Sequence, residues 1–169
     1  MYINSTIVEF FYKIKKWEVN IMRQFKHIGA YGLILDKDKI VLIKKVGGPY
    51  DGKLDLPGGT IEWGENPETT LIRELEEEVG IKVLDYQLFD GNSVTFEWIH
   101  KGELIKGHHI GFFYKINSFE NEIKSNILID KINDDSLGAK FYDINKLKKS
   151  ELSNTANLEI EKLGYKLFD

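Results

Sequence analysis

The sequence predicts an α/β fold in which helices pack on a mixed β-sheet. Apolar runs rich in strand-forming residues recur along the chain, one helix with sharply marked ends interrupts them, and a shorter helix lies near the C-terminus. With 169 residues, of which 42% are hydrophobic, the chain is long enough to bury one core. We therefore expect one folded domain, residues 25–169, preceded by an extension, residues 1–24.

The extension carries apolar side chains at helical spacing, which predicts an amphipathic helix. These side chains are Ile7, Phe10, Phe11, Ile14 and Trp17. We expect the helix to pack on the domain or on a second subunit, and the alternative is a helix that binds a partner or a membrane surface. Charged residues interrupt its apolar run, so we do not expect an export signal.

The first strands lie on either side of a polar turn. Residues 25–35 and 40–46 are rich in strand formers and predict a hairpin whose turn is residues 36–39. Residues 47–52 have the composition of a loop, and residues 54–56 predict a short strand that ends before Pro57.

A helix over residues 67–79 follows, and signals mark both of its ends. Asn66 is an N-cap residue, Pro67 suits the first helical position, and Gly80 suits the position after the last turn. Further strands are predicted at 82–89, 94–100, 109–116 and 141–144, with turns at Gly91–Asn92 and Lys101–Gly102 and a last helix at 157–163.

Charge and composition limit the classes of partner. The chain has 23 basic and 27 acidic residues, so its net charge of −4 gives no overall positive field for a long nucleic acid. No run approaches the ~20 apolar residues that a membrane span needs. Cysteine is absent, which excludes disulfides and thiolate metal sites and makes the cytoplasm the simplest setting.

The predicted helix places three carboxylates on one face. Glu74, Glu77 and Glu78 are related as i, i+3 and i+4, whereas the apolar residues of the helix cluster on the other side. Like charges at this spacing repel by about 0.2–0.5 kcal/mol per pair, so a cation is expected to offset them. Hard divalent cations take several oxygen ligands, whereas Arg73 brings only one charge.

Two glycines just before the helix favour a ligand site over a solvated acidic face, which is the ordinary interpretation of a Glu-rich helix. Gly58 and Gly59 allow the backbone to pass close to a ligand, so a main-chain carbonyl can join the carboxylates. Taken alone, such a pair is more often only a turn.

The whole segment resembles the Nudix box. The box has a glycine, a glutamate after five residues and, after seven more, the run Arg-Glu-aliphatic-any-Glu-Glu-any-Gly-aliphatic. Its fixed places are filled here by Gly59, Glu65, Arg73, Glu74, Leu75, Glu77, Glu78, Gly80 and Ile81. Chance agreement at all nine is on the order of 10⁻⁹ per window. The likeness extends more loosely over residues 25–163, with Leu54 at a place where relatives often have tryptophan.

The resemblance implies the Nudix fold, an α/β/α sandwich around a mixed β-sheet, and hydrolysis of a pyrophosphate bond in a nucleoside diphosphate derivative. It places the metal ligands on Glu74, Glu77, Glu78 and the carbonyl of Gly58, with Mg²⁺ as the expected ion and Mn²⁺ as the alternative. Glu65 and Arg73 become supporting groups of the catalytic set.

The resemblance leaves the general base open. Glu77 is our first choice, and Asp135, in the loop before the last strand, is the main alternative, followed by Asp134 and Glu120. The resemblance also makes Lys45, near the box, a candidate to contact a substrate phosphate, and the alternative is an ordinary exposed lysine. His108 and His109 are expected to be structural or solvated, and Tyr50, Phe96 and Trp98 either stack on a base or belong to the core.

The substrate is predicted from missing markers. Some Nudix subfamilies carry a proline past the box for ADP-ribose, or a tyrosine slightly further on for dinucleoside polyphosphates, whereas Phe96 and Trp98 stand here. We therefore expect a MutT-type nucleoside triphosphate pyrophosphohydrolase acting on a small nucleotide, as a monomer or homodimer. The alternatives are an ADP-ribose or nucleotide-sugar pyrophosphatase and a sensing module that binds without cleaving. The complete set of box glutamates disfavours the sensor.

Overall fold

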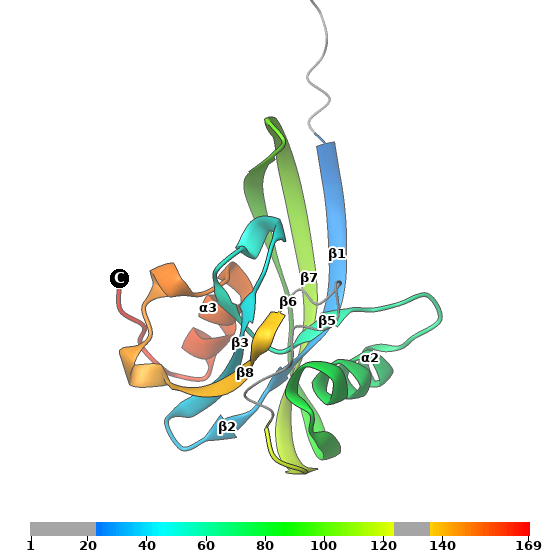
Figure 1. The fold of residues 1–169 in the computed structure, drawn as a ribbon, viewed down its shortest axis with the longest axis vertical. Coiled ribbons are helices and arrows are strands. Elements are labelled where there is room, and N and C mark those ends of the chain that lie inside the picture. The colour runs from blue at the N-terminus through cyan, green and yellow to red at the C-terminus, as the bar shows by residue number, and fades with distance from the viewer. Residues whose placement is uncertain (1–22, 124–135) are drawn as a thin grey trace, which may run out of the picture.

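The computed structural model describes residues 23–123 and 136–169, which form two β-sheets and the helices that cover them (Figure 1). One sheet has the strand order β5-β1-β7-β6, and the other has β2-β3-β4 with β8 also paired to β3. The strands are β1 (Arg23–Leu33), β2 (Leu35–Asp36), β3 (Lys39–Lys45), β4 (Leu54–Asp55), β5 (Gly58–Thr60), β6 (Lys82–His100), β7 (Glu103–Glu120) and β8 (Ser136–Asp143). Because β1 and β7 are parallel while their other neighbours are antiparallel, the first sheet is mixed, as predicted.

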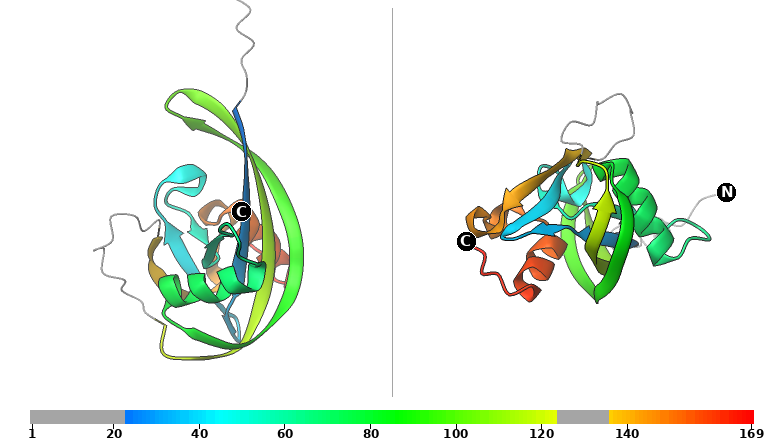
Figure 2. Two further views of the ribbon diagram at one scale, coloured as in Figure 1. Left: turned by 90° about the vertical axis from the view of Figure 1, so that its right-hand side faces the viewer. Right: turned by 90° about the horizontal axis from the view of Figure 1, so that it is seen from below.

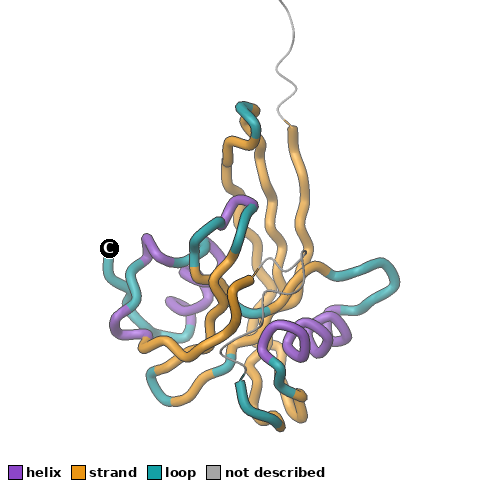
Figure 3. Tube along the Cα trace, in the orientation of Figure 1, coloured by secondary structure: helices purple, strands orange, loops and turns teal. Residues whose placement is uncertain are grey.

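Two helices cover opposite sides of the strands. Helix α2 (Pro67–Glu74) continues into a π-helical turn, η2 (Leu75–Val79), and α3 (Asn154–Lys162) lies near the C-terminus. Short 3₁₀ turns are η1 (Gly48–Tyr50), η3 (Ile144–Lys146) and η4 (Lys149–Glu151). Figure 3 shows the helical segments beside the strands.

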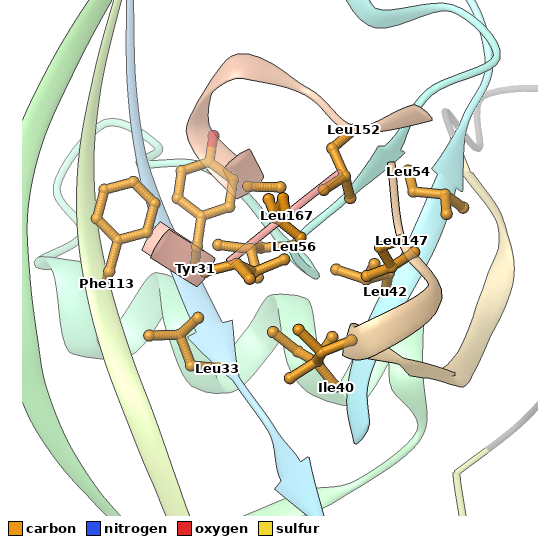
Figure 4. Packing of buried hydrophobic residues seen from close by; sticks show 13 residues of the cluster. Tyr31, Leu33, Ile40, Leu42, Leu54, Leu56, Phe113, Leu147, Leu152 and Leu167 are labelled. Atoms are coloured by element: carbon orange, nitrogen blue, oxygen red, sulfur yellow. The ribbon is translucent and has the colours of Figure 1, made fainter. Parts of the chain in front are cut away.

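The core has two parts because β1 and β3 bury both of their faces. Tyr31 and Leu42 belong to the part that contacts α3, shown in Figure 4, whereas the adjacent residues Ala30 and Val41 belong to the part under α2 and η2. Alternate side chains of a strand point to opposite faces, so the same strands serve both layers. The result is the predicted sandwich with one helix on each side.

The structure corrects the predicted first hairpin. The run 25–35 is divided at Ile34, so β1 pairs with β5 and β7, and only the two-residue β2 pairs with β3. Ile34 is fully buried where the chain passes from one sheet to the other. A run that is apolar throughout gives no sign of such a change of sheet.

The predicted turn at Gly91–Asn92 is also wrong. Strand β6 passes through both residues, with Gly91 opposite Phe112 and an irregular register between Leu88 and Asp90. Strand β7 is almost as long as β6 and satisfies the backbone of these turn-forming residues, so the ladder continues. Figure 2 shows the two long strands curving side by side into one hairpin, whose turn at Lys101–Gly102 was predicted.

The helix limits agree closely with the sequence. Asn66 accepts a hydrogen bond from the N–H of Thr69, Pro67 opens the helix, and Gly80 takes a left-handed conformation after it. The difference lies in the last turn, where the N–H of Gly80 reaches the carbonyl of Leu75 in a π-helical bond. Helix α3 starts at Asn154, three residues before the predicted start, because Ser153 caps it.

Two other expectations fall at the edge of the described residues. The extension 1–24 lies outside them except for Arg23 and Gln24, which begin β1. Within residues 23–123 and 136–169, no helix has both the length and the apolar character needed to cross a bilayer.

Candidate active site

A cavity of about 540 Å³ lies between β1, η1 and the ends of β4, β5, β6 and β7. One end is lined by Gly58, Gly59 and Glu74, from the segment with the acidic residues. We call this the acidic end. The other is lined by Phe25, Tyr50, Phe96 and His109, which we call the aromatic end. The volume is that of an ordinary small-molecule site.

Arg73 organises the acidic end. Its Nε lies 2.9 Å from Oε1 of Glu65 and its Nη2 lies 2.9 Å from Oε2 of the same carboxylate, so the pair is bidentate. Its Nη1 lies 2.7 Å from Oε1 of Glu74 and 3.7 Å from Oε2 of Glu77. One guanidinium thus joins the loop before the helix to two glutamates of the helical segment.

Glu65 is held as a carboxylate. The hydrogen bonds from Arg73 and from the hydroxyl of Thr70, at 2.6 Å, lower the pKa of Glu65 to about 2. Its contact with the N–H of Glu62 closes the loop between β5 and α2. The carboxylate therefore keeps Arg73 in a fixed orientation.

The two glycines bring the backbone against the carboxylates. The N–H of Gly58 donates to Oε2 of Glu78 at 2.8 Å, and the φ of Gly58 is 137°, which disfavours any side chain. A Cβ at Gly59 would overlap the carboxylate of Glu74. Gly58 must therefore be glycine, whereas a side chain at Gly59 would displace the carboxylate of Glu74.

The three glutamates of the box differ in their exposure and in what their side chains face. Glu74 and Glu78 face the Gly58–Gly59 backbone, and only 14% of the Glu74 side chain is exposed. The Glu77 side chain is 58% exposed. In the described part of the chain, no three Asp, Glu, His or Cys side chains are gathered closely enough to hold a metal ion by themselves. The π-helical turn differs from the regular i, i+3, i+4 spacing that predicted a single face.

The aromatic end consists of rings from four segments, β1, η1, β6 and β7. The rings of Tyr50 and Phe96 are 5.3 Å apart, and those of Phe25 and Phe96 are 6.0 Å apart. Gly107 makes room for this arrangement, because a Cβ there would overlap the Phe96 ring. Flat aromatic surfaces of this kind suit stacking on a planar ligand.

A buried hydrogen-bond chain runs beside these rings. The hydroxyl of Tyr31 lies 2.7 Å from Nε2 of His109 and 2.8 Å from Nε2 of His27, so it donates to one imidazole and accepts from the other. Burial, with the nearby His27 and Lys45, lowers the pKa of His109 to about 3. His109 is therefore neutral at physiological pH.

Other predicted site residues fall in different places. Lys45 lines the cavity, as do Tyr50 and Phe96, whereas Trp98 does not. Glu120 is paired with Lys82 at the far end of β7. Asp134 and Asp135 lie outside the described residues.

Several cavity residues were missed or undervalued by the sequence reasoning. Asp55, Tyr31 and His27 were not singled out, and His109 was expected to be structural or solvated. Asp55 did leave a signal, because it is a charged residue between Leu54 and Leu56 in a short apolar strand. His27 and Tyr31 left no such signal in the sequence, because they alternate along β1 as ordinary core residues of a strand do.

Comparison with known proteins agrees with the geometry. The family model described as NUDIX domain matches residues 25–161. An ADP-ribose pyrophosphatase of Methanocaldococcus jannaschii is 31% identical over 140 residues, which cover 80% of this chain and 74% of that protein. An 8-oxo-dGTP diphosphatase of Escherichia coli is 40% identical over 63 residues, which cover 36% of this chain and 49% of that protein.

Solved structures are similar in fold. A MutT NUDIX hydrolase from Burkholderia pseudomallei has a TM-score of 0.58 at 24% identity, covering 82% of this chain and 98% of that chain. A mutator MutT protein from Bacillus halodurans has a TM-score of 0.61 at 19% identity, covering 84% of each chain. At these identities the likeness concerns the fold alone.

Proposed function

The chain belongs to the NUDIX hydrolase family, and on this premise we propose that it hydrolyses a pyrophosphate bond of a nucleoside triphosphate with the help of a divalent cation. The observation that carries the proposal is the joining of an acidic end, ordered by Arg73, to an aromatic end in one cavity. The acidic end suits a polyphosphate with its cation, and the aromatic end suits a nucleotide base.

The acidic end has the donor chemistry of a site for a hard cation. The carboxylates of Glu74 and Glu78 lie against the backbone of Gly58 and Gly59, and carboxylate and main-chain carbonyl oxygens are the ligands that a hard cation takes. Glu77 lies between these two glutamates in the sequence and is exposed, so its side chain can turn toward them. Glu74, Glu77, Glu78 and the carbonyl of Gly58 are the groups that would hold Mg²⁺, or Mn²⁺ in its place.

When bound, the ion supplies charge neutralisation at the phosphates and polarisation of the attacking water. The remaining work falls to side chains of the protein. Arg73 holds Glu65 and Glu74 in place, and Lys45 brings a positive charge to the cavity for a phosphate oxygen. Glu77 accepts the proton of the water as general base, with Asp135 as the alternative base.

One observation favours a second substrate. The similarity to the archaeal ADP-ribose pyrophosphatase extends over 80% of this chain, whereas that to the E. coli 8-oxo-dGTP diphosphatase covers 36%. ADP-ribose is therefore the second candidate. A sensor without activity is disfavoured because all of the box glutamates are present.

A substrate screen tests the proposal. Purified protein with Mg²⁺ is incubated with nucleoside triphosphates, 8-oxo-dGTP, ADP-ribose, nucleotide sugars and dinucleoside polyphosphates, and products are separated by chromatography. We expect nucleoside monophosphate and pyrophosphate from a triphosphate. Preferred release of AMP from ADP-ribose would establish the second candidate, and binding without turnover of any compound would establish the sensor.

A further inference from the structure

Asp55, at the end of β4, is a carboxylate in the wall of the cavity that the proposed chemistry does not use. Its side chain is almost fully buried, with 3% of the residue exposed. Three donors converge on Oδ1: the N–H of Leu56 at 2.9 Å and the hydroxyls of Ser153 at 2.5 Å and Thr155 at 3.3 Å. Oδ1 therefore has no room for a further hydrogen-bond donor, and it faces the start of α3.

The second oxygen of Asp55 has a different environment. Within residues 23–123 and 136–169, no donor reaches Oδ2. The charge of Lys45 acts on this carboxyl and lowers its pKa, against the effect of burial. Burial raises the pKa of Asp55, so a ligand that donated hydrogen bonds to Oδ2 would relieve part of the cost of burying the charge.

The hydroxyl of the neighbouring Tyr50 also has an unsatisfied hydrogen bond. This hydroxyl is buried, and in the described residues it has no hydrogen-bond partner. Burial and the charge of Asp55 both raise its pKa, so the hydroxyl keeps its proton and can donate it. The cavity wall therefore holds two groups whose hydrogen bonds are unsatisfied within the described residues. Oδ2 of Asp55 can accept a hydrogen bond and the hydroxyl of Tyr50 can donate one, and both lie near the rings of Phe96 and His109.

We propose that Asp55 determines base specificity by accepting hydrogen bonds from the ring N–H and amino group of a guanine-type base, while Tyr50 donates to the carbonyl of that base. The inference rests on the proposed nucleoside substrate. Guanine offers N1–H and N2–H₂ donors next to the O6 acceptor, so it satisfies both residues. Adenine places an acceptor, N1, where guanine has a donor, and would leave the carboxylate opposed by a lone pair.

A purely structural role does not require a carboxylate. Attachment of β4 to α3 needs only an acceptor for the donors of Leu56, Ser153 and Thr155, and an amide oxygen supplies one. A negative charge at this buried place has a cost that the three inner contacts alone do not explain. The charge of Lys45 offsets part of this cost, and a ligand with N–H groups would offset more of it.

Asp55→Asn is the decisive variant. The inner donors retain the amide oxygen, so the NH₂ group turns toward the cavity and replaces an acceptor by a donor. We expect the ratio of kcat/KM for GTP to that for ATP to be above one in the wild type and to fall about 10- to 100-fold in the variant. A loss of folding alone would lower both values together.

Thr155→Val is the matched control, because it removes an inner hydroxyl without changing the cavity side of Asp55. We expect a lower melting temperature and an unchanged base ratio. Tyr50→Phe removes the hydroxyl whose hydrogen bond is unsatisfied. It should lower the guanine preference by a smaller factor than Asp55→Asn does. If Asp55→Asn does not fold, Tyr50→Phe decides alone, and an unchanged ratio in it overturns the assignment.

Binding is measured separately by calorimetry with GMP and AMP in the absence of metal, so that it does not depend on turnover. An equal base ratio in wild type and Asp55→Asn overturns the inference and leaves the proposed hydrolase intact. A change in the ratio of ribo- to deoxyribonucleotides without a change of base ratio also overturns it, because Asp55 would then contact the sugar. Failure of the wild type to hydrolyse any nucleotide overturns the proposed function itself.

Discussion

The acidic end of the cavity comes from one continuous stretch, residues 58–78, whereas the aromatic end is assembled from β1, η1, β6 and β7. Arg73, Glu65 and Glu74 contact each other across a few residues of loop and helix. Phe25 and Phe96 are far apart in sequence and meet only because β1 and β6 both pair with β7. The proposed metal site thus comes from a local stretch of sequence, whereas the proposed base site depends on how the sheet is assembled.

Removal of metal should have the largest effect and would test the acidic end as a whole. We expect excess EDTA to abolish hydrolysis and Mg²⁺ to restore it, because Glu74, Glu77 and Glu78 are otherwise negative groups next to an anionic substrate. The measurement is turnover of the best substrate from the screen. Undiminished turnover in EDTA would remove the metal mechanism.

Glu77→Gln should have the next largest effect. The amide keeps the shape and exposure of the side chain, so we expect normal folding, while turnover falls by about 10²–10⁴. Glu76→Gln is the matched control, since Glu76 is also exposed and lies next to it. Equal small effects of the two substitutions on an active, metal-dependent enzyme would mean that this face is merely solvated.

Phe96→Ala would sharpen the contrast between the two ends. The loss of a stacking surface should raise KM about 5- to 100-fold and leave kcat nearly unchanged. Trp98→Ala is the control, because Trp98 lies two residues further along the same strand but does not line the cavity. A fall in kcat with constant KM would mean that the aromatic end takes part in the chemistry.

The pH dependence of unfolding tests the Arg73–Glu65 pair. Because the folded protein lowers the pKa of Glu65 from 4.5 to about 2, the pair contributes stability above about pH 4.5. This contribution is lost as the pH falls through the folded pKa. We expect urea midpoints of the wild type to decline over this window, and those of Glu65→Gln to decline less. Parallel curves would contradict the assigned pair.

Truncation should have the smallest effect on activity. We propose that residues 25–169 form the hydrolase domain and that the preceding extension packs on it or on a second subunit. A chain that begins at Met22 should keep its turnover per folded molecule, although its melting temperature or assembly state changes. A folded but inactive chain, tested by circular dichroism and the same assay, would show that the extension contributes to the site.

The helical segment shows how far local signals reach. Asn66, Pro67 and Gly80 marked its ends correctly because capping and left-handed conformation depend on neighbours within a few residues. The π-helical turn was not predicted, because it depends on how Leu75 and Val79 fit into the core. For the same reason the sequence overestimated how closely the three glutamates share one face.

The sequence by itself determined the family, the sandwich of helices on a mixed sheet, and the residues of the acidic end. Each of these was predicted from residues that are close together in the sequence. Only the tertiary structure decided that β6 is a single strand through Gly91, because its long partner β7 supplies the backbone hydrogen bonds. It also brought Asp55 beside Tyr50 in the cavity wall. Neighbours of this kind come from separate segments, and their chemistry depends on burial and pairing that no local pattern specifies.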